Sequence, residues 1–133
     1  MLQHIGLALT EEEEVSRFYE NILSFRVHHR FALYPEVALD LFGVNKSVDV
    51  VVMEKEGLQL ELFIHQKKET KTFTHLCLVE ETLESIAEKA RQAGYRLKER
   101  RQPGKVTYFL WDHSGNLFEL KQGEHDKNHS NPV

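Results

Sequence analysis

The sequence predicts an α+β fold made of two βαβββ modules in tandem. Three observations support this prediction: the order of strand-like and helix-like segments, a self-similarity between the two halves of the chain, and a length that suits one domain. The chain has 133 residues, of which 41% are hydrophobic and 29% are charged, so it can bury an apolar core. We expect a single domain whose modules share that core.

The first helix is predicted in residues 10–24, where apolar residues recur at intervals of three and four. Thr10 and Glu13 have the spacing of a capping box, which would start this helix. The apolar stripe consists of Val15, Phe18, Tyr19, Ile22 and Leu23.

Two further helices are predicted on similar grounds. A second apolar stripe lies in residues 83–90, and Gly94 suits the position just past a helix end. A short helix is predicted at residues 35–42, with Pro35 in its first turn and Gly43 after its last.

Runs rich in β-branched and aromatic residues predict eight strands. They are expected at residues 4–9, 25–31, 48–54, 58–65, 73–79, 95–100, 106–111 and 117–122. Together with the first and second helices, they follow the order β-α-β-β-β twice.

The two halves of the chain align with each other. HIGLAL at residues 4–9 resembles HLCLVE at residues 75–80, and VVVMEKEGLQLELF at 50–63 aligns without a gap with YFLWDHSGNLFELK at 108–121. We therefore expect one domain over residues 1–122, with a first module at about 1–66 and a second at about 73–122. Residues 123–133 lack periodicity and apolar content, and they are predicted to be a flexible tail.

Composition excludes several classes of function. The 17 basic and 21 acidic residues give a formal net charge of -4, which argues against a nucleic-acid-binding protein. No apolar run is long enough to span a bilayer, and the start MLQHIGLALTEEEE lacks the features of a signal peptide. Cys77 is the lone cysteine, so an intrachain disulfide is excluded, and we expect it to be a small buried hydrophobe. These observations predict a cytoplasmic protein with no membrane partner.

Two histidines and two glutamates occupy matching positions of the repeat. Alternation along residues 58–65 puts Glu61 on the less apolar face of its strand, and Glu119 has the same setting in the second module. Burying an unpaired carboxylate costs on the order of several kcal/mol of folding free energy, unless the carboxylate meets a cation or a solvated cavity. His4 and His75 lie in the first strand of each module.

Such a set of donors suits one divalent metal ion. Neutral imidazole nitrogen and anionic carboxylate oxygen together stabilise a 2+ ion, which in turn removes the penalty of burying the carboxylates. Two ligands from each half would leave roughly two octahedral positions for water or substrate. Zn, Ni, Co, Mn and Fe(II) all suit these ligands, and the identity of the metal stays open.

Several stretches resemble the vicinal oxygen chelate superfamily, which includes glyoxalase I, methylmalonyl-CoA epimerase, extradiol dioxygenases, and bleomycin and fosfomycin resistance proteins. The resemblance covers residues 1–122. It rests on HIGLALTEEEEVSRFYENILSF, LELF, FTHLCLV and WDHSGNLFEL. It implies mixed sheets curled into a cup around a metal, with the helices outside, and a homodimer. It also implies a ligand set of the glyoxalase I type, formed by His4, Glu61, His75 and Glu119.

The chain departs from glyoxalase I at two positions. Ala8 stands where that enzyme has an arginine that helps to hold the glutathione carboxylate, and His65 stands where an asparagine is expected. These changes argue against glutathione thiohemiacetal as the substrate. The methylmalonyl-CoA epimerase carries glutamine where Glu61 stands, so this chain departs from the epimerase as well.

The resemblance implies a metal-dependent lyase or isomerase of the glyoxalase type, similar in chemistry to lactoylglutathione lyase. Its small substrate would chelate the ion through adjacent oxygens and react through an enediolate. Glu119 is our first choice as the base, with Glu61 as its symmetry mate. The residues expected to contact substrate are Gln59, Phe63, His65, Lys105 and Leu117.

Two alternative functions remain open at this point. An extradiol dioxygenase or an epimerase of the same superfamily is one, and strict dependence on Fe(II) and oxygen would distinguish the dioxygenase. The other is a bleomycin-type protein that binds a small molecule, which would have an apolar pocket and no stoichiometric metal. The ligand pairs could come from one chain or from two chains of a homodimer.

Overall fold

The computed structural model describes residues 1–66 and 73–123. The chain forms two compact units that divide between Glu69 and Thr70, and each is described by itself. Apart from Gly123, the segment predicted as a flexible tail lies outside the described residues.

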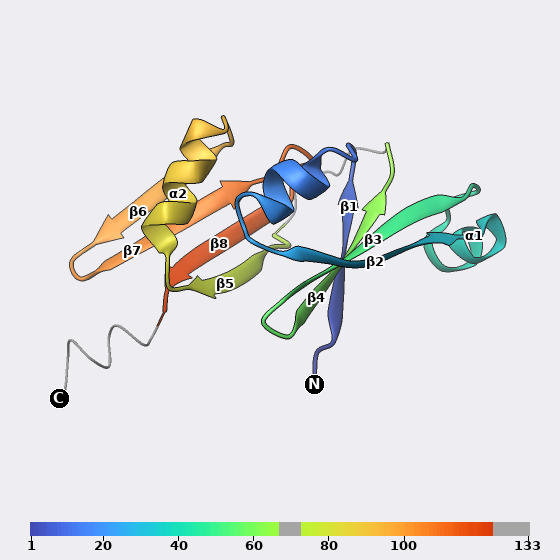
Figure 1. Cartoon of the computed structure of the whole chain (residues 1–133), viewed down its shortest axis with the longest axis horizontal. Coiled ribbons are helices and arrows are strands. Elements are labelled where there is room, and N and C mark those ends of the chain that lie inside the picture. The colour runs from blue at the N-terminus through green and yellow to red at the C-terminus, as the bar shows by residue number, and fades with distance from the viewer. Residues whose placement is uncertain (67–72, 124–133) are drawn as a thin grey trace. The chain divides into compact units, whose positions relative to one another are not determined.

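The first unit is a mixed four-stranded sheet with two helices (Figure 1). Its elements are β1 (His4–Leu9), η1 (Val15–Glu20), β2 (Arg26–Leu33), α1 (Pro35–Phe42), β3 (Val48–Lys55) and β4 (Leu58–Ile64). The strand order is β1-β4-β3-β2, with β1 parallel to β4 and the other pairs antiparallel. A two-residue turn joins β3 to β4, and its residues Glu56 and Gly57 have φ angles of 49° and 85°. Positive φ at both positions is the geometry that matches the twist of a hairpin, and glycine adopts it without strain.

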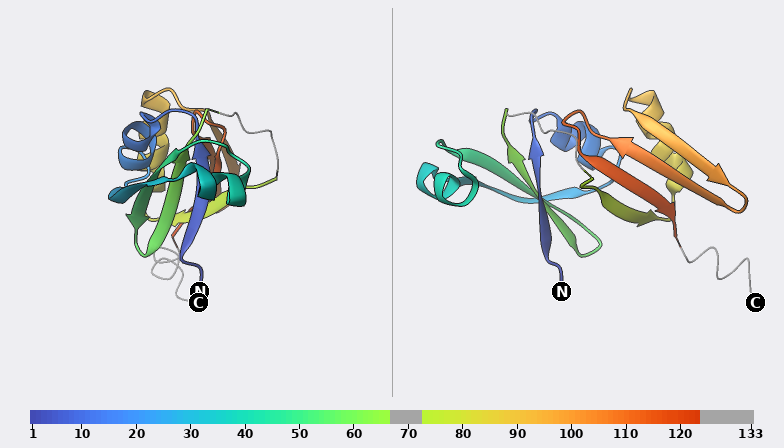
Figure 2. Two further views of the ribbon diagram at one scale, coloured as in Figure 1. Left: turned by 90° about the vertical axis from the view of Figure 1, so that its right-hand side faces the viewer. Right: turned by 180° about the vertical axis from the view of Figure 1, so that it is seen from behind.

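The second unit repeats this topology. Its elements are β5 (Leu76–Glu80), α2 (Leu83–Gln92), β6 (Leu97–Gln102), β7 (Lys105–Trp111) and β8 (Leu117–Gln122). The strand order is β5-β8-β7-β6, with β5 parallel to β8. The views in Figure 2 show α2 lying along one face of this sheet. The predicted α+β class and the tandem βαβββ modules are therefore confirmed.

The beginning of the chain's first helix differs from the prediction. Residues Val15–Glu20 form a wide turn of π-helix, in which Asn21 N–H donates to the Ser16 carbonyl and Leu23 N–H to the Phe18 carbonyl. The N-cap position is Glu14, whose side chain makes no capping hydrogen bond, so the helix begins later than the start predicted at Thr10. Backbone turns that begin at Glu11 already bond the first N–H groups, which removes the need for a side-chain cap.

The apolar stripe predicted for α2 is confirmed. Its four residues are buried, and α2 contacts β6 and β8. The stripe consists of Leu83, Ile86, Ala87 and Ala90. Leu110, Phe118 and Leu120 of the sheet are also fully buried, as expected for the sheet face that a helix covers. No helix within residues 1–66 and 73–123 is long and apolar enough to cross a membrane.

Tyr108 anchors a polar network on the helix-covered face of the second sheet. Its ring is fully buried, and its hydroxyl donates a 2.7 Å hydrogen bond to Glu84 Oε1. Burial, followed by the hydrogen bond to Glu84, raises the pKa of the Tyr108 phenol above its usual value. Arg91 lies with its guanidinium carbon 5.7 Å from the centre of the Tyr108 ring.

We predict that this network makes stability depend on pH at high pH. Because the pKa of Tyr108 is raised in the folded state, its hydrogen bond contributes fully to the free energy of unfolding below about pH 10. This contribution is lost as pH rises through the folded pKa. The Tyr108→Phe variant should be less stable by about 1 kcal/mol at pH 7. Its difference from the wild type should shrink above pH 10 in urea unfolding experiments. A difference that stays constant up to pH 11 would contradict the prediction.

Candidate metal centre

In the first module, His4 on β1 and Glu61 on β4 lie side by side. The register pairs Glu61 with Gly6 and pairs His4 with Gln59, so the imidazole reaches Glu61 diagonally across two parallel strands. His4 Nε2 is 3.5 Å from Glu61 Oε1. Gly6 has no side chain to intervene, and a Cβ there would come within 3.0 Å of the Phe63 ring.

The second module forms an equivalent pair from His75 and Glu119. The sequence predicts His75 within a strand. In the structure it lies immediately before β5, which begins at Leu76. The register pairs Glu119 with Cys77, and His75 Nε2 is 3.2 Å from Glu119 Oε1. The side chains are exposed to similar degrees in both modules, 45% and 21% for the first pair and 42% and 20% for the second.

A backbone contact defines the tautomer of His75. Its Nδ1 lies 2.9 Å from the carbonyl oxygen of Phe73. A carbonyl oxygen can only accept, so Nδ1 carries the proton. In the neutral imidazole, Nε2 then presents a lone pair toward a carboxylate oxygen that also only accepts. Two acceptors at this distance require a cation between them or a proton on Nε2, and this orientation is typical of a metal-binding histidine.

The distances in both pairs fit a metal ion. Ligand atoms about 2.1 Å from one ion and separated by 90–110° are about 3.0–3.4 Å from each other. The two observed distances, 3.2 Å and 3.5 Å, lie at or near this interval. The neutral nitrogen and anionic oxygen donors are those that Zn, Ni, Co, Mn and Fe(II) accept, so the residues of each pair fit such an ion.

The two pairs differ in what surrounds the glutamate. Lys121 Nζ lies 3.4 Å from the second oxygen of Glu119. The equivalent residue of the first module is Phe63, whose ring packs edge-on against Phe42 of α1 at 5.3 Å between centroids. Glu119 is therefore paired with a cation, whereas the inserted helix α1 places an aromatic cluster near Glu61.

The other residues predicted to contact substrate lie on the same sheet faces as these two glutamates, at different positions along the strands. Gln59 and Phe63 alternate with Glu61 along β4, and Leu117 precedes Glu119 by two residues on β8. His65 follows the end of β4, and its N–H extends the ladder with a 2.8 Å bond to the Leu9 carbonyl. Lys105 begins β7 and is exposed.

Two features of this region were not predicted from the sequence. Cys77 is exposed rather than buried. The surrounding protein atoms still remove part of the water around its thiol, and this desolvation, with the Glu119 carboxylate as a smaller cause, raises its pKa. Arg26 forms a bond of 2.7 Å to Glu54 Oε2, which lowers the pKa of that carboxyl. The cross-strand partners of Cys77 and Arg26 depend on register, which a local pattern does not specify.

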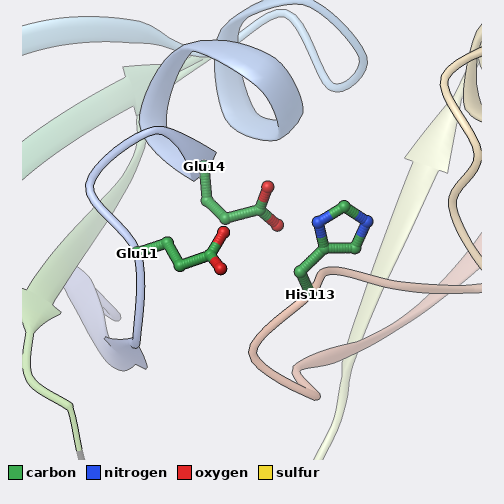
Figure 3. Close-up of side chains that lie close together, drawn as sticks. All are labelled: Glu11, Glu14 and His113. Carbon is green, nitrogen blue, oxygen red and sulfur yellow. The ribbon is translucent and has the colours of Figure 1, made fainter.

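Further acidic and imidazole side chains lie in loops. Glu11 and Glu14 come from the turn before η1 (Figure 3), where Glu11 is exposed and Glu14 is buried. His113 lies in the loop after β7 and stacks on Tyr95 at 4.2 Å between ring centroids. None of these three residues takes part in the two His–Glu pairs.

A family comparison agrees with this geometry. The model of the Glyoxalase/Bleomycin resistance protein/Dioxygenase superfamily matches residues 1–120. The chain belongs to this superfamily. A comparison with curated proteins finds no match. Membership of the Glyoxalase/Bleomycin resistance protein/Dioxygenase superfamily confirms the resemblance noted in the sequence.

Solved structures share the fold at low sequence identity. A mutant of the FosX fosfomycin resistance protein from Listeria monocytogenes, complexed with Mn(II) and 1S,2S-dihydroxypropylphosphonic acid, is 18% identical with a TM-score of 0.73, covering 97% of both chains. The trypanothione-dependent glyoxalase I of Leishmania major is 14% identical with a TM-score of 0.71, covering 99% of this chain and 93% of its own. A glyoxalase family protein from Enterococcus faecalis is 21% identical with a TM-score of 0.69, covering 91% and 96%. At these identities the superfamily fold is what the chains share.

Proposed function

We propose that this protein is a metal-dependent lyase or isomerase of the glyoxalase type, acting on a small substrate with adjacent oxygen atoms. The observation that carries the proposal is the pair formed by His75 and Glu119, in which a tautomer held by Phe73 turns Nε2 toward a carboxylate oxygen. The equivalent pair of His4 and Glu61 in the first module adds support, because an isolated ion pair need not recur at the matching positions of a repeat.

The proposal requires both His–Glu pairs to bind the same divalent ion, within one chain or across a homodimer. Such an ion, when bound, would polarise the substrate's oxygens and acidify the neighbouring carbon-bound proton. His4 and His75 would bind the ion through their imidazoles and would not exchange protons with the substrate. The metal called for is one of Zn, Ni, Co, Mn and Fe(II), as in the sequence-based expectation.

Glu119 is proposed as the base that takes the proton from one carbon and returns it to the next. Its carboxylate is one-fifth exposed, so substrate can reach it. A base must come within hydrogen-bond reach of the proton that it removes. Lys121 Nζ lies 3.4 Å from the second carboxylate oxygen of Glu119 and helps to hold the carboxylate in its orientation. Glu61, its symmetry mate, would be the other carboxylate ligand of the metal.

The test combines metal analysis with a proton-exchange assay. The purified protein is expected to bind one equivalent of divalent metal per site, measured by elemental analysis after dialysis. In D2O, the metal-loaded protein should incorporate deuterium at the carbon next to the carbonyl of hydroxyketones such as dihydroxyacetone, followed by proton NMR. The same protein treated with a chelator serves as the control.

Other outcomes would favour the alternatives. Consumption of oxygen with catechol and Fe(II), without deuterium incorporation, would identify a dioxygenase. Substoichiometric metal together with tight binding of an apolar drug would identify a binding protein. Either result would overturn the proposed lyase or isomerase function.

A further inference from the structure

We propose that the Glu119 face of the second sheet binds an anionic group of the substrate, a phosphate, phosphonate or carboxylate, through Lys98 and Arg100. This inference rests on the proposed function and names the substrate class of the same site. It starts from the distribution of charge over the sheet formed by β5–β8.

Cross-strand register places the residues of this face in rows. Lys98 pairs with Phe109, which pairs with Glu119, and these three side chains lie on one face. The next row contains Arg100, Thr107 and Lys121. Neighbouring strands are about 4.8 Å apart. The backbone of Lys98 is therefore about 10 Å across the sheet from that of Glu119, within reach of a long side chain and a small molecule.

Cationic side chains outnumber carboxylates on this face. It has one carboxylate, Glu119, and five cationic residues. These are Arg96, Lys98, Arg100, Lys105 and Lys121. The protein as a whole has a formal charge of -4, so the excess of cations here is local.

The opposite face of the same strands shows the contrast. There, Arg101 Nε lies 2.7 Å from Glu99 Oε2, and Arg91 also contacts Glu99 at 3.5 Å. On the Glu119 face, Lys98, Arg100 and Lys105 form no ion pair with any residue within 73–123. Like charges gathered without counter-charges repel one another. An anionic ligand would relieve this repulsion.

Aromatic rings give this face a second property. Phe109 and Trp111 are half-buried, and the Arg96 guanidinium carbon stacks over the Trp111 ring, 4.0 Å from its centroid. A half-buried apolar floor lowers the local dielectric constant, which strengthens a charge-assisted hydrogen bond from Lys or Arg to an anion. The face therefore suits a small organic anion.

The test compares two probes that share a hydroxyketone and differ in charge. Dihydroxyacetone phosphate is expected to bind the metal-loaded protein about 10-fold to 100-fold more tightly than dihydroxyacetone, measured by calorimetric titration. Hydroxypyruvate serves as the carboxylate arm and distinguishes that source of charge from phosphate. The preference for the charged probes should weaken as salt concentration rises.

A pair of double variants identifies the residues responsible. Lys98→Ala/Arg100→Ala should reduce the preference for dihydroxyacetone phosphate to about threefold or less. The matched control Lys46→Ala/Lys89→Ala removes the same charge from exposed positions elsewhere and should leave the preference unchanged. Metal content is measured for every variant. Circular dichroism checks that each one is folded.

The results separate this inference from the proposed function. If metal binds and both probes bind equally, the anion site is refuted and the metalloenzyme proposal stands. If both double variants weaken binding equally, a general effect of net charge explains the preference and the proposed site is refuted. If no metal binds while dihydroxyacetone phosphate still binds through Lys98 and Arg100, the anion site stands and the proposed function fails.

Discussion

The Glu119→Gln variant is expected to lose catalysed deuterium exchange by about 1,000-fold or more, because an amide cannot accept the substrate proton. The amide keeps the size of the carboxylate and an oxygen that can still point toward His75. The melting temperature should therefore stay within a few degrees of the wild type, since Glu119 is partly exposed and lies outside the apolar core. The exchange rate is followed by proton NMR on protein of known metal content.

Two further variants interpret this result. Glu81→Gln makes the same substitution at an exposed residue outside the sheet and should leave the rate unchanged. Glu61→Gln should weaken metal binding yet retain more activity than Glu119→Gln. If Glu61→Gln is instead the variant with the greater loss of rate at full metal occupancy, the base is Glu61 and our assignment is wrong.

The second large effect is expected when either histidine is removed. His4→Ala and His75→Ala should each weaken metal affinity by about 100-fold or more, since lesser changes around a metal site already cost 10-fold to 100-fold. Metal affinity is measured by competition with a chelator. The exposed imidazole His28→Ala is the control, because it contacts His29 rather than either pair. Equal affinity in His28→Ala and His75→Ala would contradict the proposed ligand set.

Mixing the two inactive variants decides where the pairs meet. If each site joins the first module of one chain to the second module of its partner, a His4→Ala/His75→Ala heterodimer contains one intact site. Random mixing would then restore about a quarter of the wild-type activity. If each site forms within one chain, every site keeps a defect and no activity returns.

Much of the secondary structure followed from local pattern. β1, β8 and α1 have the predicted bounds, because alternation and helix-terminating residues act over a few positions. Gly43 and Gly94 indeed have positive φ values, 71° and 81°. The first helix was harder to predict, since backbone turns from Glu11 onward precede it and it begins only at Val15. The start of the strand after His75 depended on pairing with β8, which no local signal reports.

By itself, the sequence determined the repeat, and with it the equivalence of His4 to His75 and of Glu61 to Glu119. Only the tertiary structure decided that each histidine lies within 3.5 Å of its glutamate, that Phe73 orients the imidazole of His75, and that Lys121 contacts Glu119. The physical reason is that side-chain alternation is a property of one strand. Contact between side chains depends instead on register between strands distant in the chain, and one residue of slip would turn each side chain to the other face.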